Sequence, residues 1–441
     1  MYEAIIGIVL LRFAVSNFRS IHDPVEFSLI AVDDDRPAAR TVSSLKHKVL
    51  TTAAIYGPNA SGKSNVIDAL YWFSNQVFSS MSSISQLIPV SKFKFAEGPQ
   101  RNSHIEVEMI LDGVRYDYFV EFNEKEIVNE SLHNYPKLRR RTVFERIGNS
   151  IEPSRNLSQR NALQELTTPT TFILSAGFKL QVPEIYSFAR AIMDFQYIGR
   201  FASSGIGAYL DHLRVDQNPT EAIFYEHYDH AGPSLFEDQD FSGSSMREKA
   251  MALLRFADMG IRDVRINQFP KTSESDKSLV RFNMRRQLQM LHSSGKEQVP
   301  FDMVEESLGT QKWFALIGPL LNALERGVPL VVDELDTSLH PNLSERIINL
   351  FRDPETNPRN AQLIFTTHDV QLFNTLNRDE IWITEKDDSG ATKLTGLAEY
   401  GGTVVRKDAN LERAYLKGKY GGIPFLDEEF ISNVVNSGPK S

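Results

Sequence analysis

The amino-acid sequence predicts an α/β fold built around a parallel sheet, because three short apolar stretches each end in polar residues. Residues 49–56 are apolar and β-branched and lead into a glycine-rich segment. Residues 329–332 lead into two acids, and residues 363–367 lead into a histidine. Short apolar runs of this kind are typical of strands buried on both faces of a parallel sheet. Ligands of such sheets lie at the carboxyl ends of the strands, so we expect the functional site at that edge.

The glycine-rich segment is the most specific motif in the chain. It fits the pattern G-x-x-x-x-G-K-S/T and runs through Gly57, Pro58, Asn59, Ala60, Ser61, Gly62, Lys63 and Ser64, with Asn65 directly after it. A strand before it and apolar residues at helical spacing after it give the context in which this motif binds phosphate. Backbone N–H groups and the positive end of the helix then face the phosphate oxygens. We predict that Lys63 reaches the β- and γ-phosphates of a nucleoside triphosphate and that Ser64 binds Mg²⁺. The alternative, a glycine-rich turn without a ligand, is disfavoured by these flanks.

The other two strand ends supply candidate catalytic residues. Asp333 is placed to hold Mg²⁺ beside Ser64, and Glu334 is placed to polarise an attacking water. An acid pair after four apolar residues is common, so a solvated strand end is the alternative for this pair. His368 ends the next apolar strand, where its side chain could contact a γ-phosphate. The alternative is that the His368 side chain only makes hydrogen bonds at its own strand end and binds no ligand.

A Ser/Gly/Thr cluster precedes an apolar helix in the second half of the chain. Ser307, Gly309 and Thr310 lie at the predicted helix start. Such a cluster is an ordinary N-cap. It is also a second anion site, and its distance in sequence from Lys63 means that it need not serve the same nucleotide.

The order of these motifs resembles that of the ATP-binding-cassette (ABC) ATPases of the soluble SMC/RecF branch. In that resemblance Ser307 and Gly309 correspond to the signature motif, so we call residues 307–310 the signature segment; Asp336 corresponds to the D-loop and His368 to the switch histidine. A ring-forming AAA+ ATPase fits less well, because the signature helix and the terminal strand-histidine are not its pattern. No Asn-Lys-x-Asp motif for reading guanine occurs, which favours ATP over GTP.

The chain is also similar to the bacterial RloA/AbiL group of ABC-type ATPases, with PARIS AriA and OLD-family ATPase domains as more distant relatives. This resemblance rests on softer motifs, each with a packing explanation: residues 17–20, 89–95, 135–136, 144–146, 379–382 and 415–424. The group is associated with restriction loci and abortive phage infection, and its members act with a separately encoded effector, often a nuclease. The chain lacks a convincing glutamine for the lid hinge of ABC ATPases, and Gln86 and Gln100 are the nearest candidates.

Periodicity, taken with the resemblance to ABC ATPases, predicts three parts. Residues 1–160 form an N-terminal ATPase lobe with an antiparallel β layer, because residues 105–111 and 114–122 alternate around Asp112-Gly113, a type I′ hairpin signal. Residues 161–295 form a compact helical lid insertion, mostly helical and without the sustained heptads of a long coiled coil. Residues 296–441 form the C-terminal ATPase lobe with the signature segment, the acid pair, the D-loop and the switch histidine.

Composition excludes several classes of protein. The chain has 441 residues, no cysteine and a net charge of -9, so disulfides, thiolate metal sites and a global electrostatic attraction to nucleic acid are excluded. It has no run of eighteen apolar residues, so we expect no membrane partner and a cytoplasmic location. Local basic runs near residues 137–141 and 281–286 leave DNA as a possible partner, although such runs are most often solvated faces. The acids near residues 387–388 and 427–429 lack the pattern of a nuclease site.

These observations predict an ATPase that uses ATP and Mg²⁺ and forms a head-to-tail homodimer. Each nucleotide lies between residues 57–64 of one subunit and residues 307–310 of the other, with Glu334 as the base and His368 on the γ-phosphate. A larger assembly of such dimers stays open. We expect the protein to act in anti-phage defence by controlling an effector. Two alternatives stay open: a DNA-repair ATPase that clamps DNA, and a scaffold with negligible ATP turnover.

Overall fold

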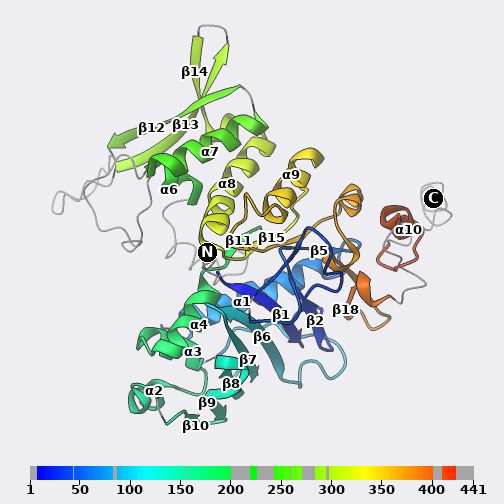
Figure 1. The fold of residues 1–441 in the computed structure, drawn as a ribbon. Helices are drawn as coiled ribbons and strands as arrows, with labels where there is room; N and C mark the ends of the chain where they lie inside the picture. Colours follow the sequence, from blue (N-terminus) through cyan, green and yellow to red (C-terminus); the bar gives the residue numbers. More distant parts are fainter. Residues whose placement is uncertain are drawn as a thin grey trace, which may run out of the picture.

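The computed structural model describes residues 7–42, 44–82, 87–155, 157–199, 219–225, 243–258, 260–270, 284–294, 297–400 and 410–423. Two sheets with helices around them make up most of this part of the chain (Figure 1). No helix within these ranges is long and apolar enough to span a bilayer.

The central sheet has the strand order β11-β15-β16-β5-β17-β18. All of its neighbouring pairs are parallel except β17 and β18. The strands are β11 (Gln196–Ile198), β15 (Leu330–Val332), β16 (Leu363–Thr366), β5 (Thr52–Tyr56), β17 (Ile381–Lys386) and β18 (Thr392–Gly396). The three strands predicted from apolar runs, β5, β15 and β16, are therefore neighbours, which confirms the α/β prediction.

Residues of β5 alternate between two hydrophobic clusters on opposite faces of this sheet, because successive side chains of a strand point to opposite sides. Ala53 and Ile55 belong to the cluster that joins the helix α1 (Lys63–Ser79) to the second sheet. Ala54 and Tyr56 belong to the cluster with α8 (Leu308–Arg326) and α9 (Pro341–Arg352). Burial on both faces explains why β5 reads as an unbroken apolar run.

The second sheet is antiparallel, with the strand order β10-β9-β8-β7-β6-β1-β2. Its strands are β1 (Val9–Ser16), β2 (Val25–Ser28), β6 (Ser103–Leu111), β7 (Val114–Phe122), β8 (Ile127–Asn134), β9 (Arg141–Ile147) and β10 (Ser150–Pro153). The predicted hairpin is confirmed: Leu111 pairs with Val114, and Asp112 and Gly113 have φ of 46° and 76°. Positive φ at both turn residues is the type I′ geometry.

The segment predicted to be mostly helical contains three strands beside its helices, so the prediction missed part of its structure. The segment does contain α2 (Arg160–Leu166), α3 (Ile173–Lys179), α4 (Pro183–Met193), α6 (Pro219–Tyr225) and α7 (Gly243–Ala257). It also contains β12 (Ile261–Pro270) and β13 (Met284–Ser294), which form a three-stranded sheet with β14 (Glu297–Asp302). A register shift between Ile261 and Asp263 breaks the alternation of β12, which hid the strand signal. No long coiled coil occurs in the described ranges.

The first part of that segment packs on the core rather than apart from it. α4 contacts α1 and β6, and β11 is the edge strand of the central sheet. The division into three parts with boundaries near residues 160 and 295 stays a prediction.

Residues 410–423, which include α10 (Leu411–Leu416), dock on the central sheet. Tyr415 stacks on Phe373 with ring centroids 4.8 Å apart, and Phe373 lies 4.3 Å from the ring of Tyr56. The Tyr415 hydroxyl donates a 2.6 Å hydrogen bond to the Gly422 carbonyl. The motif around Tyr-Gly-Gly-Ile thus has a packing role.

Candidate functional site

The loop between β5 and α1 has a backbone that only certain residues accept. Gly57 and Gly62 have φ of 147° and 107°, and Gly62 is the N-cap of α1. A Cβ added to Gly57 would collide with the Thr384 side chain, and one added to Gly62 would collide with the Thr392 side chain. Both positions therefore require glycine for conformation and for space.

Two threonines, one in β17 and one in β18, form hydrogen bonds with this loop and with the strand before it. Thr384 Oγ1 lies 2.6 Å from Ser61 Oγ and donates a 3.0 Å hydrogen bond to the Tyr56 carbonyl. Thr392 Oγ1 donates a 2.8 Å hydrogen bond to the Ser61 carbonyl. Sequence reasoning missed both threonines, although Thr384 follows an apolar run just as the acids do at the other strand ends. These contacts fix the conformation of the loop.

The Lys63 side chain folds back onto its own loop. Its ammonium donates hydrogen bonds to the carbonyls of Gly57 at 2.9 Å and Pro58 at 3.1 Å. Burial lowers the pKa of Lys63 to about 8, and three nearby carboxylates, of which Asp333 is the strongest, oppose that shift. A phosphate oxygen at this place would give the buried ammonium a charged partner in place of two carbonyls.

The structure brings Ser64 and Asp333 together, as the sequence analysis expected. Ser64 Oγ donates a 2.9 Å hydrogen bond to Asp333 Oδ1, and Thr366 Oγ1 donates a 2.7 Å hydrogen bond to the same oxygen. Asp333 is buried. Hydroxyl and carboxylate oxygens are the ligands that Mg²⁺ prefers, so these donors fit the ion.

Glu334 follows Asp333 in a strained conformation. Its φ is 56°, in the left-handed region that non-glycine residues seldom adopt. Two contacts hold it there: its N–H donates to Thr366 Oγ1 at 2.7 Å, and Thr337 Oγ1 donates to its carboxylate at 3.2 Å. Strain of this kind is typical of functional positions.

His368 lies two residues beyond β16, as Glu334 lies two residues beyond the neighbouring strand β15. Its backbone N–H donates to the Asp336 carboxylate at 3.2 Å, which ties the D-loop residue to the histidine. Burial lowers the pKa of the His368 imidazole, and the Lys63 charge lowers it further, while nearby acids oppose the shift. The imidazole is therefore neutral at neutral pH and can donate one hydrogen bond.

The signature segment, residues 307–310, begins α8 but lies against the D-loop. The Ser307 hydroxyl caps the helix by accepting from the Thr310 N–H at 3.1 Å. A Cβ on Gly309 would lie 2.8 Å from the Ser338 carbonyl. Ser307 is exposed, and Leu308 is 60% exposed. In the described part of the chain no hydrogen bond joins this segment to residues 57–64.

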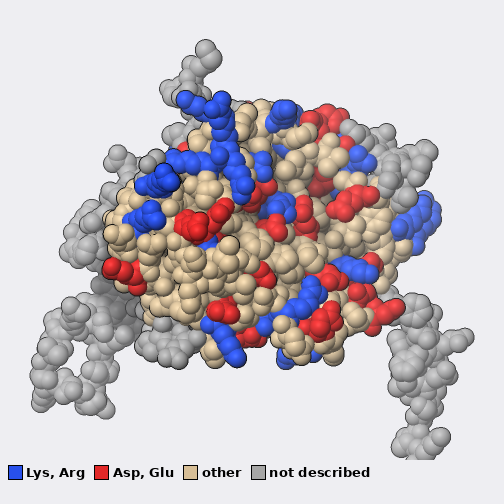
Figure 2. Space-filling model, turned by 90° about the horizontal axis from the view of Figure 1, so that it is seen from below, with Lys and Arg blue, Asp and Glu red and all other residues tan. Residues whose placement is uncertain are grey.

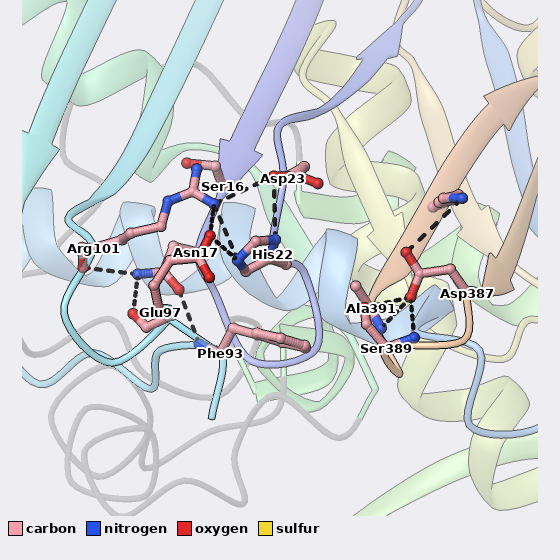
Figure 3. A network of polar contacts seen from close by, with 12 residues as sticks. Ser16, Asn17, His22, Asp23, Phe93, Glu97, Arg101, Asp387, Ser389 and Ala391 are labelled. Carbon is pink, nitrogen blue, oxygen red and sulfur yellow. Dashed lines mark hydrogen bonds and ion pairs between the residues drawn. The ribbon is translucent and has the colours of Figure 1, made fainter. Parts of the chain in front are cut away.

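Two of the softer motifs, residues 17–20 and 89–95, are joined by hydrogen bonds of the buried Asn17 side chain (Figure 3). The Asn17 side chain donates 2.8 Å hydrogen bonds to the carbonyls of Gly98 and Arg101, and it accepts one from the Phe93 N–H at 3.2 Å. Asn17 is fully buried. Residues 17–20 thus hold the loop at 93–101, which also contains Gln100. The other hinge candidate, Gln86, lies outside the described residues.

Residues next to Asn17 reach the nucleotide loop, which sequence reasoning did not foresee. Ser20 Oγ lies 2.7 Å from Thr392 Oγ1 and accepts a 2.5 Å hydrogen bond from Asn65. Arg19, at φ of 51°, forms an ion pair with Asp68 in the first turns of α1. The edge of the antiparallel sheet therefore contacts the start of the phosphate-binding helix.

Comparison with known families gives one match, over residues 53–374, to the AAA_21 family, described as "AAA domain, putative AbiEii toxin, Type IV TA system". The chain belongs to this family. Membership and the site geometry together show that this AAA_21 chain has the P-loop ATPase fold. The narrower similarity to the RloA/AbiL group stays a prediction.

Solved structures similar to this AAA_21 chain include the SMC head domain from Thermotoga maritima, with 12% identity, 88% of this chain and 98% of that chain covered, and a TM-score of 0.37. Another is an SmcHead bound to the C-winged helix domain of ScpA, with 13% identity, 88% and 97% coverage, and a TM-score of 0.43. A comparison with curated proteins found no match.

Proposed function

We propose that this AAA_21 chain binds and hydrolyses ATP with Mg²⁺, shares each nucleotide between two copies, and controls a separately encoded effector, a nuclease, in anti-phage defence. One observation carries the first part: Ser64 and Thr366 converge on Asp333 beside the buried Lys63. That arrangement supplies a phosphate cradle, a cation site and a strand end in a single place.

The geometry supports the proposed division of catalytic roles. Glu334 directly follows Asp333, the proposed cation ligand, so its carboxylate would orient a water against a γ-phosphate. His368 follows the neighbouring strand β16 by two residues, and burial lowers the pKa of its imidazole, so the neutral ring would donate a hydrogen bond to a phosphate oxygen without adding charge. Positioning and charge would supply most of the rate.

The proposed sharing of the nucleotide rests on the exposed start of α8. Ser307 and Leu308 are exposed, and Val304 beside them is 84% exposed. The N-terminus of this 19-residue helix is a favourable place for an anion, and within one chain the segment contacts the D-loop instead. A γ-phosphate held by Lys63 of a second copy would give Ser307 its anion.

The proposed defence role draws on the family description, which names a toxin and a toxin–antitoxin system. The face of the molecule in Figure 2 carries Lys and Arg intermixed with Asp and Glu, so that face offers no continuous basic surface for a DNA duplex.

The experiment that tests this proposal expresses the chain with and without the gene adjacent to its own and measures phage plaque formation. We expect protection only when both genes are present, and loss of protection when Lys63→Ala replaces the wild type. Purified protein is assayed for ATPase activity in parallel, with and without linear DNA. If the chain gives no protection either alone or with the adjacent gene, and DNA strongly stimulates its ATPase activity, the DNA-clamping alternative would be favoured.

A further inference from the structure

Three side chains from separate elements converge outside the nucleotide site. Asp258 follows the last residue of α7, His292 lies on β13, and Glu306 directly precedes the signature segment. One potential ligand atom from each lies within 4.8 Å of the other two. His292 Nε2 lies 2.7 Å from Glu306 Oε1. A Cβ on Gly260 would be 3.1 Å from both Asp258 Oδ1 and His292 Nδ1, so the aspartate and the imidazole flank the same point.

The charges of this cluster are not balanced by the protein. Two carboxylates lie within 4.8 Å of each other, and the Glu306 side chain is only 6% exposed. No lysine or arginine in the described ranges forms an ion pair with either carboxylate. A histidine–glutamate hydrogen bond accounts for one contact, but it leaves the Asp258 carboxylate close to that of Glu306 without a cation. Like charges at this separation repel each other, and a divalent cation would neutralise both.

We propose that Asp258, His292 and Glu306 bind a divalent transition-metal ion. One imidazole nitrogen and two carboxylate oxygens are a donor set that suits Zn²⁺ or Mn²⁺, with water completing the coordination. Mg²⁺ binds here more weakly, because it prefers oxygen ligands and a strict octahedral arrangement.

The ion joins three elements next to Ser307. It holds the end of α7 and strand β13 against Glu306, whose carbonyl already accepts a 2.9 Å hydrogen bond from Gln311 in α8. Metal binding thereby fixes the direction in which α8 begins. Its effect on ATP turnover rests on the proposed function, whereas the binding of the metal does not.

The test uses the purified full chain, freed of metal with a chelator and titrated with Zn²⁺, Mn²⁺ or Mg²⁺ by calorimetry. We expect one Zn²⁺ or Mn²⁺ per chain beyond the nucleotide site. His292→Gln and Asp258→Asn should each weaken that binding by at least about tenfold. Two variants serve as controls: His47→Gln removes an exposed histidine elsewhere, and Asp333→Asn removes the proposed nucleotide-site ligand. Both should retain the new site.

A second measurement guards against variants that simply unfold. Co²⁺ bound to an imidazole and carboxylates gives a visible absorption band, which wild type should show and His292→Gln should lack at equal protein content by circular dichroism. Zn²⁺ should raise the thermal unfolding temperature of the wild type but not that of His292→Gln. Equal binding by wild type and His292→Gln, or no saturable binding by wild type, would overturn the metal site and leave the ATPase proposal standing.

Discussion

Ser64 Oγ donates a 2.9 Å hydrogen bond to Asp333 Oδ1 although the two residues are 269 positions apart in the sequence. The contact joins the end of the phosphate-binding loop to the end of β15. Because parallel strands end at one edge of the sheet, two unrelated segments meet there to make one site. The predictions below follow from that meeting point.

Lys63→Ala should abolish ATP binding, because a buried triphosphate would lose its main positive partner. Retention of a fluorescent ATP analogue is the measurement, and the exposed Lys46→Ala should bind like the wild type. Equal retention by Lys63→Ala and wild type would refute the assignment of the loop.

Glu334→Gln should separate binding from chemistry. The amide keeps the shape of the side chain but cannot orient a water as the carboxylate does, so turnover should fall by about two orders of magnitude or more. ATP binding should stay normal, and light scattering should show an ATP-dependent dimer. Glu345→Gln, on the exposed side of α9, is the matched control. Turnover near that of wild type would exclude Glu334 as the base.

Thr366→Val should remove a hydrogen bond from both Asp333 and Glu334. Its hydroxyl donates to Asp333 and accepts from the Glu334 N–H, so the variant leaves two groups of the site with a lost partner. We expect the free energy of unfolding to fall by about 1–3 kcal/mol and more Mg²⁺ to be needed for half-maximal turnover. Urea denaturation and Mg²⁺ titration measure the two effects, with the exposed Thr41→Val as control. An unchanged Mg²⁺ requirement would mean that Thr366 does not position Asp333.

ATP affinity should fall as the pH rises above about 8. Burial lowers the pKa of free Lys63 to about 8, whereas a bound phosphate keeps the ammonium charged. Binding above that pH therefore takes up a proton, and the dissociation constant should rise by up to about tenfold per pH unit. Below pH 8 Lys63 is already charged, so the constant should be flat. Lys63→Arg, if it binds the analogue, should lose this dependence; a wild-type constant that is flat from pH 7 to pH 9.5 contradicts the account.

The sequence predicted those parts of the site that lie on local motifs. The loop at residues 57–64, the acid pair and the hairpin turn at Asp112-Gly113 follow from short-range patterns, and the structure has them where they were expected. Thr366, Thr384 and Thr392 were missed because a threonine in a strand gives no sign of what it bonds. Their partners come from other strands, which only the folded sheet brings close.

The lid segment shows a second limit. β13 does alternate at Leu288 and Met290, but β12 contains a register shift that moves Val264 out of step with Ile261. With one strand irregular, the pair could not be recognised as a hairpin from periodicity alone. The buried Asn17 was read only as part of a motif, because its hydrogen bonds to residues 93–101 depend on tertiary contacts.

The shared-site mechanism is the central claim, and a mixing experiment tests it most directly. Ser307→Arg puts bulk and charge where the γ-phosphate of the other copy should bind, so it should bind ATP but not hydrolyse it. Lys63→Ala keeps Ser307 but lacks a working loop. Mixed in equal amounts, the two inactive proteins should recover up to about one quarter of the wild-type rate, because half of the dimers are mixed and each has one complete site. No recovery on mixing, with Ser307→Arg hydrolysing ATP at the wild-type rate per chain at every dilution, would contradict the account.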